Sequence, residues 1–173
     1  MMNVQHESPE HFVQLEEAVI ELYQTVFSEP PYFETEVHVR QFRSFFEKHL
    51  QAPGFSFMSA RDDARLVGMA YGVTFAPGRW WADASQEPPE ELRTAPTFAV
   101  MEWAVHPDYR RQGIGSQLIN ALLADRAESW ATLCVNPHAH AYDIYLRAGW
   151  QPCGTSGSEP LPPAVILIKE LKP

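Results

Sequence analysis

The chain has 173 residues, of which 45% are hydrophobic and 20% charged. A chain of this length and composition can bury one sizeable core, and it is far from the composition of a disordered protein. Lys and Arg number 13 against 22 Asp and Glu, and the resulting formal net charge of -9 opposes attraction to nucleic acid phosphates and anionic lipid. We therefore expect a single domain over residues 1–173, with neither nucleic acid nor a membrane as its partner.

The cysteines and the apolar runs of the sequence indicate in which cellular compartment the protein is expected. Only two cysteines occur, Cys134 and Cys153, and no amino-terminal segment combines a basic start with an apolar run as a secretory signal does. The longest apolar run near the carboxyl end, residues 164–168, is far too short to span a bilayer. The expectation is a cytoplasmic protein with both thiols reduced.

The amino-terminal part of the sequence predicts a short strand followed by two helices. The strand is expected at residues 3–6, and helical spacing of apolar residues predicts helices over 9–27 and 35–50. A pair of prolines ends the first helix. The residues expected on the buried helix faces are Phe12, Leu15, Val19, Leu22, Val26, Phe27, Val39, Phe42, Phe46 and Leu50.

The middle of the chain predicts a hairpin and then a long loop. Residues 55–60 and 66–75 are apolar, and the polar turn between them favours two antiparallel strands. Residues 77–96 are rich in proline and contain Trp80 and Trp81, so an irregular loop is expected there.

From residue 97 onward, strand and helix patterns alternate. The predicted elements are a strand at 98–105, a helix from 115 to about 128, a strand at 130–135, a helix at about 139–148, and strands near 149–153 and 164–170. A βαβ unit with antiparallel flanks is the economical assembly, and the fold class is α/β of the α+β kind.

The turn between the first of these strands and its helix has the character of an anion site. It reads WAVHPDYRRQGIGSQLINALL, from Trp103 to Leu123. Gly113 and Gly115 would let the backbone approach a ligand, and the amides at a helix start favour negative charge. Two arginines, Arg110 and Arg111, add positive charge to an acidic molecule, and together these features suit a pyrophosphate.

Two nucleotide-binding motifs can be eliminated at this turn. A P-loop requires a lysine and then Ser or Thr after its second glycine, but Ser116 and Gln117 follow Gly115. A dinucleotide fingerprint requires a third glycine, and Leu118 occupies its place. A P-loop nucleotide hydrolase is therefore excluded.

Two segments of the chain resemble the GNAT family of N-acetyltransferases. The segment AVHPDYRRQGIGSQLINALL contains the acyl-CoA signature Arg/Gln-x-x-Gly-x-Gly/Ala at residues 110–115, placed between a strand and a helix as in that family. The segment AYDIYLRAGW at residues 141–150 is similar to a second family pattern, with Trp150 in place of the usual phenylalanine. VFSEPPY and LVGMAYG also fit, so the resemblance covers nearly the whole chain.

The resemblance implies a fold and a cosubstrate. The fold is a mixed, mostly antiparallel twisted sheet of six to seven strands with a splayed βαβ acyl-CoA site, flanked by about four helices. The cosubstrate is acetyl-CoA, no metal is required, and the amine attacks the thioester directly without an acyl-enzyme. The acyl-CoA-binding positions that the resemblance implies are Trp103, Ala104, Val105, Arg110, Arg111, Gln112, Gly113, Ile114, Gly115, Ser116, Asn136, His138 and Tyr142.

Two residues are candidates for moving protons. Tyr145 matches the family position of the acid that protonates the departing CoA sulfur, and its alternative role is a buried tyrosine in the core. Glu102 is the candidate base, and its alternative is a structural or substrate-orienting carboxylate. By strict alternation Glu102 lies on the strand face opposite to Trp103, unless a bulge interrupts the strand.

Three further groups of residues are candidates for binding a ligand. Asn136 or His138 is expected to contact the pantetheine arm: Asn136 follows the strand where the family often has a polar residue, whereas the family's usual spacing to the tyrosine favours His138. The alternative is a solvated loop. A metal site of His138, His140 and Cys134 is not expected, because positions i and i+2 of a helix diverge. Trp80 and Trp81 either form an apolar lid over the substrate or cover the core.

The function that follows is transfer of an acetyl or short acyl group to a primary amine. The acceptor is a small molecule or a peptide or protein amine, and the acidic balance weakly favours cations. The alternative is a non-catalytic acyl-CoA-binding sensor or interaction module, which would keep the glycines and lose the proton-transfer groups. Both a monomer and a homodimer remain open.

Overall fold

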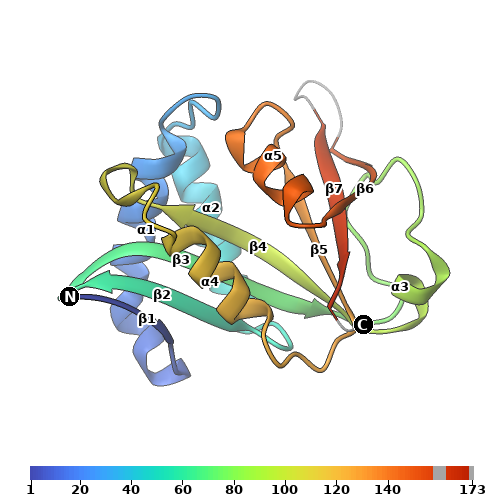
Figure 1. Cartoon of the computed structure of the whole chain (residues 1–173), viewed down its shortest axis with the longest axis horizontal. Helices are drawn as coiled ribbons and strands as arrows, with labels where there is room; N and C mark the ends of the chain where they lie inside the picture. Colours follow the sequence, from blue (N-terminus) through green and yellow to red (C-terminus); the bar gives the residue numbers. More distant parts are fainter. Residues whose placement is uncertain (158–162, 172–173) are drawn as a thin grey trace. The chain divides into compact units, whose positions relative to one another are not determined.

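The computed structural model describes residues 1–157 and 163–171, and within them the chain forms seven strands, five α-helices and two short 3₁₀ helices (Figure 1). The strands are β1 (Met2–His6), β2 (Ser56–Asp62), β3 (Arg65–Phe75), β4 (Thr97–Val105), β5 (Trp130–Val135), β6 (Gln151–Ser156) and β7 (Ala164–Glu170). The helices are η1 (Pro9–His11), α1 (Phe12–Phe27), α2 (Glu36–Leu50), α3 (Glu90–Thr94), η2 (Pro107–Tyr109), α4 (Ile114–Leu123) and α5 (His140–Arg147).

The seven strands form one mixed sheet in the order β1-β2-β3-β4-β5-β7-β6. The pairs β1–β2, β2–β3, β5–β7 and β6–β7 are antiparallel, and β4–β5 is parallel. This parallel pair and the helix α4 between its strands are the βαβ unit that the sequence predicted. The expected mixed, mostly antiparallel α/β fold is confirmed.

The chain divides into two compact units, each built from two stretches of sequence. Unit 1 consists of Met1–Val73 and Glu102–Ala124, and unit 2 of Thr74–Met101 and Asp125–Pro173. Strands β3 and β4 each contribute residues to both units. The expectation of a single domain stays a prediction.

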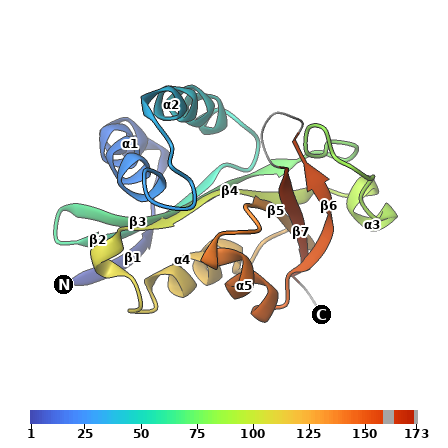
Figure 2. The ribbon, with the colours of Figure 1, turned by 90° about the horizontal axis from the view of Figure 1, so that it is seen from above.

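Unit 1 has helices on both faces of its strands. Helices α1 and α2 cover one face of β1, β2 and β3, and α4 covers the other (Figure 2). Aromatic side chains fill the α2 side: Phe46 packs edge-on against Tyr71 and Phe57, with ring centroids 5.3 and 6.2 Å apart. Burying each such ring contributes about 1.5–3 kcal/mol. Phe42 and Phe46 are buried as predicted, whereas Phe12, Val39 and Leu50 are only half-buried.

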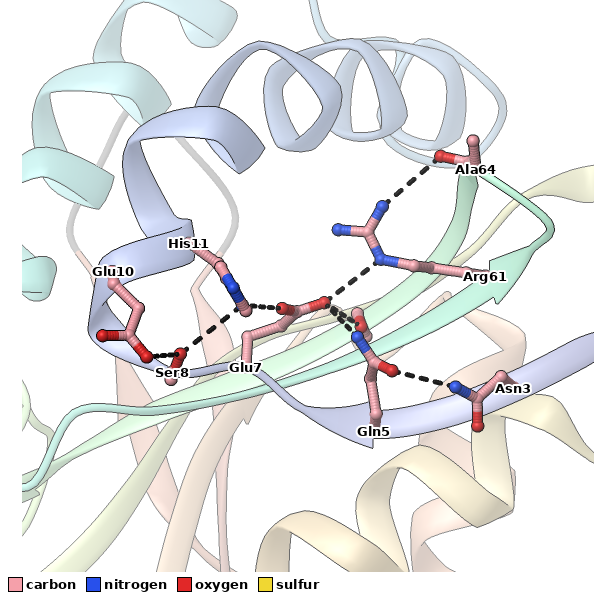
Figure 3. Close-up of polar contacts among 9 residues, drawn as sticks. Asn3, Gln5, Glu7, Ser8, Glu10, His11, Arg61 and Ala64 are labelled. Carbon is pink, nitrogen blue, oxygen red and sulfur yellow. Dashed lines mark hydrogen bonds and ion pairs between the residues drawn. The ribbon is translucent and has the colours of Figure 1, made fainter.

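A buried carboxylate joins the first strand, the second strand and η1. Glu7 is 1% exposed. It accepts hydrogen bonds from Ser59 Oγ at 2.6 Å, Gln5 Nε2 at 3.1 Å and Arg61 Nε at 3.1 Å, and His11 Nδ1 lies 3.4 Å away (Figure 3). Burial alone raises the pKa of Glu7, but these hydrogen bonds outweigh it and the pKa lies below its usual value. The carboxylate is therefore ionised and paired in the folded state.

The long loop of unit 2 is more ordered than the sequence predicted. It contains the short helix α3, which buries Leu92. Trp80 and Trp81 pack against the buried cluster of Leu92, Cys153, Ile166 and Ile168, and Trp81 Nε1 donates a hydrogen bond to Thr132 Oγ1 at 2.9 Å.

Both cysteines are free and lie in unit 2. Burial raises the pKa of the Cys134 thiol to about 12. Burial also raises the pKa of Cys153, which is 4% exposed. Both sulfurs are therefore protonated at neutral pH.

Helix α4 is shorter than predicted. The helix expected from residue 115 to about 128 ends at Leu123, because Ala124 is extended and Asp125 has a φ of 53°. Beyond this break, the buried carboxylate of Glu128 accepts hydrogen bonds from Thr74 Oγ1 at 2.5 Å and Arg126 Nε at 3.0 Å. Those side-chain bonds stabilise the non-helical path that follows the helix.

Candidate active site

The turn from β4 to α4 is tightly constructed. The His106 amide donates to the Val67 carbonyl of β3 at 2.8 Å, and η2 follows immediately. Gly113 then takes a left-handed conformation with a φ of 76° at the position that caps α4. Such a φ is unfavourable for a residue with a Cβ, so the backbone favours glycine here. The amides of the first turn of α4 lack acceptors within the helix and favour an anion.

The second glycine of the motif, Gly115, is favoured for a different reason. A Cβ at Gly115 would lie 2.9 Å from Cζ2 of Trp103, closer than side chains tolerate. The indole Nε1 of Trp103 also donates to the Gly115 carbonyl at 2.9 Å. Gly115 therefore makes room for the Trp103 ring against α4, and its expected part in ligand binding stays a prediction.

The two arginines of the motif differ in their interactions. Arg110 Nη2 donates to Glu29 Oε2 at 2.9 Å, and its Nε donates to the Val105 carbonyl at 3.2 Å. Arg111 is exposed with a φ of 62°, and it makes no ion pair with any of the residues that the structure describes. Arg110 is therefore shared with Glu29, whereas Arg111 is not, and the expected electropositive spot of both side chains stays a prediction.

Glu102 lies among three tyrosines on the other face of β4. Burial and, next, the charge of Glu102 raise the pKa values of Tyr23, Tyr32 and Tyr71. Glu102 thus faces α1 while Trp103 faces α4, as alternation along the strand predicted. Across the described part of the chain, no side chain donates a hydrogen bond to Glu102 or forms an ion pair with it. Burial, followed by the charge of Glu34, raises the pKa of Glu102 to about 8.

A second carboxylate near Glu102 was missed at the sequence level. Glu34 lies in the segment between α1 and α2 and accepts a hydrogen bond from the phenol of Tyr23. The ring of Tyr23 stacks on Phe42 of α2 with centroids 3.8 Å apart, which fixes the phenol. No local motif marks Glu34, because it is far from Glu102 in sequence and only the packing of α1 on the sheet brings the two together.

The other predicted site residues belong to unit 2. Tyr145 is 6% exposed and its ring contacts Trp150 edge-on, with centroids 5.5 Å apart. Tyr142 is half-buried on the same helix, α5. Asn136 Oδ1 accepts the His138 amide at 2.9 Å, so the Asn136 side chain holds the turn after β5, and His138 is exposed. The rings of Trp80 and Trp81 pack against the buried cluster of unit 2. A role of these two residues in acceptor binding stays a prediction.

Residues 1–157 and 163–171 contain neither a metal-binding cluster nor a membrane-spanning helix. No group of three His, Cys, Asp or Glu side chains there is arranged to hold a metal ion. No helix in those ranges is long and apolar enough to cross a membrane.

Comparison with known protein families identifies the family of the chain. A model of the acetyltransferase (GNAT) family matches residues 16–150, more than half of the chain and the whole of the β4–α4 segment. The chain belongs to the acetyltransferase (GNAT) family.

Individual relatives agree with this membership. Over 64 residues the chain is 27% identical to an alpha-tubulin N-acetyltransferase of Plasmodium vivax (strain Salvador I), a match that covers 37% of this chain and 35% of that protein. The PaiA N-acetyltransferase of Thermoplasma acidophilum, solved in complex with coenzyme A, superposes with a TM-score of 0.66 at 14% identity over 98% of this chain and 99% of its own. An aminoglycoside 6'-acetyltransferase type Ii superposes at 0.69 with 17% identity over 99% and 98%. At these identities the two structures establish the fold.

Proposed function

We propose that the protein is an N-acetyltransferase that transfers an acetyl, or another short acyl, group from acetyl-CoA to a primary amine. The observation that carries the proposal is Glu102, a half-buried carboxylate with a pKa of about 8 and no partner among the described side chains. A base whose pKa lies near the operating pH is suited to accept a proton from an amine. Glu102 is therefore the proposed general base.

The proposed reaction is a direct displacement. The neutral amine nitrogen attacks the thioester carbon, so that a C–N bond forms and the C–S bond breaks. Glu102, directly or through a water molecule, accepts a proton of the amine, and Tyr145 donates its phenolic proton to the departing sulfur and regains one from solvent. In balance, a protonated amine and acetyl-CoA give an N-acetylamine, CoA thiol and one proton.

The donor is proposed to bind at the β4–α4 turn. The amides of residues 112–116 and the exposed side chain of Arg111 supply donors and charge for the pyrophosphate. The backbone of residues 103–105 is proposed to pair with the thioester carbonyl, and Asn136, His138 and Tyr142 to line the pantetheine arm. Coenzyme A in the Thermoplasma relative supports this choice of ligand.

A thiol-release assay tests the proposal. The purified protein is incubated with acetyl-CoA and a panel of primary amines, and the release of CoA thiol is followed. We expect thiol release that depends on the amine, together with an acetylated product of the matching mass. Binding of acetyl-CoA by calorimetry without thiol release on any amine would instead indicate a non-catalytic acyl-CoA sensor.

A further inference from the structure

The segment between α1 and α2, residues 28–35, is folded so that its last charged side chain points inward; we call it the acceptor loop. The Tyr32 amide donates to the Glu29 carbonyl at 3.0 Å, and the Glu34 amide donates to the Phe27 carbonyl at 2.8 Å. The Tyr23 phenol then donates to the Glu34 carboxylate. Backbone and side chain together hold Glu34 at the inner side of the loop.

The charges around this point are unbalanced. Glu34 and Glu102 are close enough for the charge of Glu34 to raise the pKa of Glu102. In the described ranges neither carboxylate forms an ion pair with Lys, Arg or His. Arg110, whose charge acts on Tyr32, is already paired with Glu29 at 2.9 Å. Two carboxylates therefore share a partly desolvated region without a cation of their own.

Aromatic rings complete the surroundings of the two carboxylates. Tyr32 is half-buried, packs edge-on against Phe27 with centroids 4.8 Å apart, and its hydroxyl makes no hydrogen bond to any described residue. Tyr23 and Tyr71 lie within reach of the charge of Glu102. Ring faces and carboxylates are the groups that bind alkylammonium ions.

An amine that is being acetylated cannot by itself balance both carboxylates. The reacting nitrogen must be neutral when it attacks, so its positive charge is lost at the moment of reaction. A second ammonium group on the same acceptor stays charged throughout. Such a group could pair with Glu34 in the Michaelis complex and in the transition state alike.

We propose that Glu34, with Tyr32, binds a second ammonium group of the acceptor, so that the preferred substrates are aliphatic diamines and related dications. This inference rests on the proposed function and names the substrate class for it. Glu34 acts as a specificity-determining residue: it positions one end of the acceptor while Glu102 serves the reacting end.

The test compares diaminobutane, with one amine at each end, and butylamine in the thiol-release assay with acetyl-CoA. For the unaltered protein we expect kcat/KM to be at least about tenfold higher for diaminobutane, as one charge-assisted contact provides. In Glu34→Gln, whose amide oxygen can still accept the Tyr23 phenol, that preference is lost through a higher KM for diaminobutane. The kcat/KM for butylamine, compared at a pH above the Glu102 pKa of about 8, changes less than about twofold because the base is ionised in both proteins.

A matched control and a pH profile separate this role from a structural one. Glu47→Gln removes the same charge from the exposed side of α2 and should leave the diamine preference intact. In Glu34→Gln the pKa seen in kcat/KM for butylamine should fall, because Glu102 loses the like charge beside it. An unchanged pKa would show that the charge of Glu34 does not reach Glu102, and would remove a premise of the inference.

The outcomes distinguish the two proposals. Equal use of both amines by the unaltered protein, or an undiminished preference in Glu34→Gln, overturns the diamine inference and leaves the acetyltransferase proposal standing. Absence of thiol release with every amine of the larger panel overturns the proposed function, and this inference with it. Because the unaltered protein alone gives a decisive comparison, the test does not depend on the variant folding.

Discussion

At Glu102 the pH dependence of turnover has a definite sign. The base must be unprotonated, so kcat/KM for an amine rises with pH through about 8 and levels off above it. In Glu102→Gln this rise should vanish and turnover should fall by about 10²- to 10⁴-fold. Initial rates between about pH 6 and pH 10 measure both effects, since an alkylamine titrates higher, near about 10.4. Persistence of the rise near pH 8 in the variant would assign it to another group.

Tyr145 can be tested without disturbing its packing. Tyr145→Phe keeps the ring that contacts Trp150 and removes only the hydroxyl group. Acetyl-CoA affinity measured by calorimetry should stay nearly unchanged, while kcat on the true acceptor should fall at least about tenfold, because the departing sulfur loses its proton donor. Unaltered kcat would remove Tyr145 from the mechanism and leave it as a core residue.

Individual site residues differ in whether the sequence could predict them. Glu102 could be singled out because it lies in a recognisable strand just before the motif. Glu34 carries no such signal, and Tyr32 only ends the VFSEPPY segment that fits the family. Both residues come close to Glu102 because α1 packs on the sheet. Likewise, nothing in the sequence indicates that Arg110 pairs with Glu29, whereas Arg111 has no such partner in the described ranges.

Among the elements, helix α4 depends on the glycine at its start. In Gly113→Val the left-handed φ of 76° would strain the backbone by about 1–2 kcal/mol and displace the amides of the first turn. We expect acetyl-CoA affinity, measured by calorimetry, to fall at least about tenfold.

The matched control for this change is Gly78→Val. Gly78 has a φ of 87° with nothing within 4 Å of an added Cβ, so it carries a similar backbone strain in the loop of unit 2. The control should lose comparable thermal stability and keep its affinity for acetyl-CoA. Equal affinity losses in both variants would argue that strain, and not the geometry of the turn, weakens binding.

The elements themselves were predictable where local pattern and tertiary packing agree. The strand predicted at residues 130–135 is observed with those bounds as β5, since its apolar run is bounded by polar residues and is buried in the sheet. The end of α4 was not predictable, because residues 124–128 suit a helix and the break serves the buried carboxylate of Glu128. Helix α3 was missed because it is a single turn among prolines, stabilised by burying Leu92.

At the scale of the whole molecule, two buried carboxylates should shape stability in opposite directions. Glu7 has a lowered pKa when folded, so its stabilisation is full above the usual carboxyl range and is lost as pH falls below it. The pKa of Glu102 is raised from 4.5 to about 8, so stability is lost as pH rises from 4.5 through 8. The free energy of unfolding should therefore be highest in mildly acidic solution.

Two isosteric variants separate these contributions. Glu7→Gln should destabilise the protein at neutral pH by about 1–3 kcal/mol and reduce its loss of stability in acid. Glu102→Gln should stabilise it above pH 8 by at least about 1.4 kcal/mol, the equivalent of one pKa unit. Urea unfolding at three pH values measures both, and a Glu102→Gln protein less stable than the parent at high pH would contradict the raised pKa.

The protonated state of the two cysteines makes the chemistry of this protein convenient to follow. Colorimetric disulfide reagents react with thiolates, and burial, which raises the pKa of both Cys134 and Cys153, keeps them as thiols at neutral pH. The colour that develops during turnover should thus report CoA with little background from the enzyme. For the same reason a cysteine introduced at Val37, which is 52% exposed beside the acceptor loop, should accept a single maleimide fluorophore and report diamine binding by its emission.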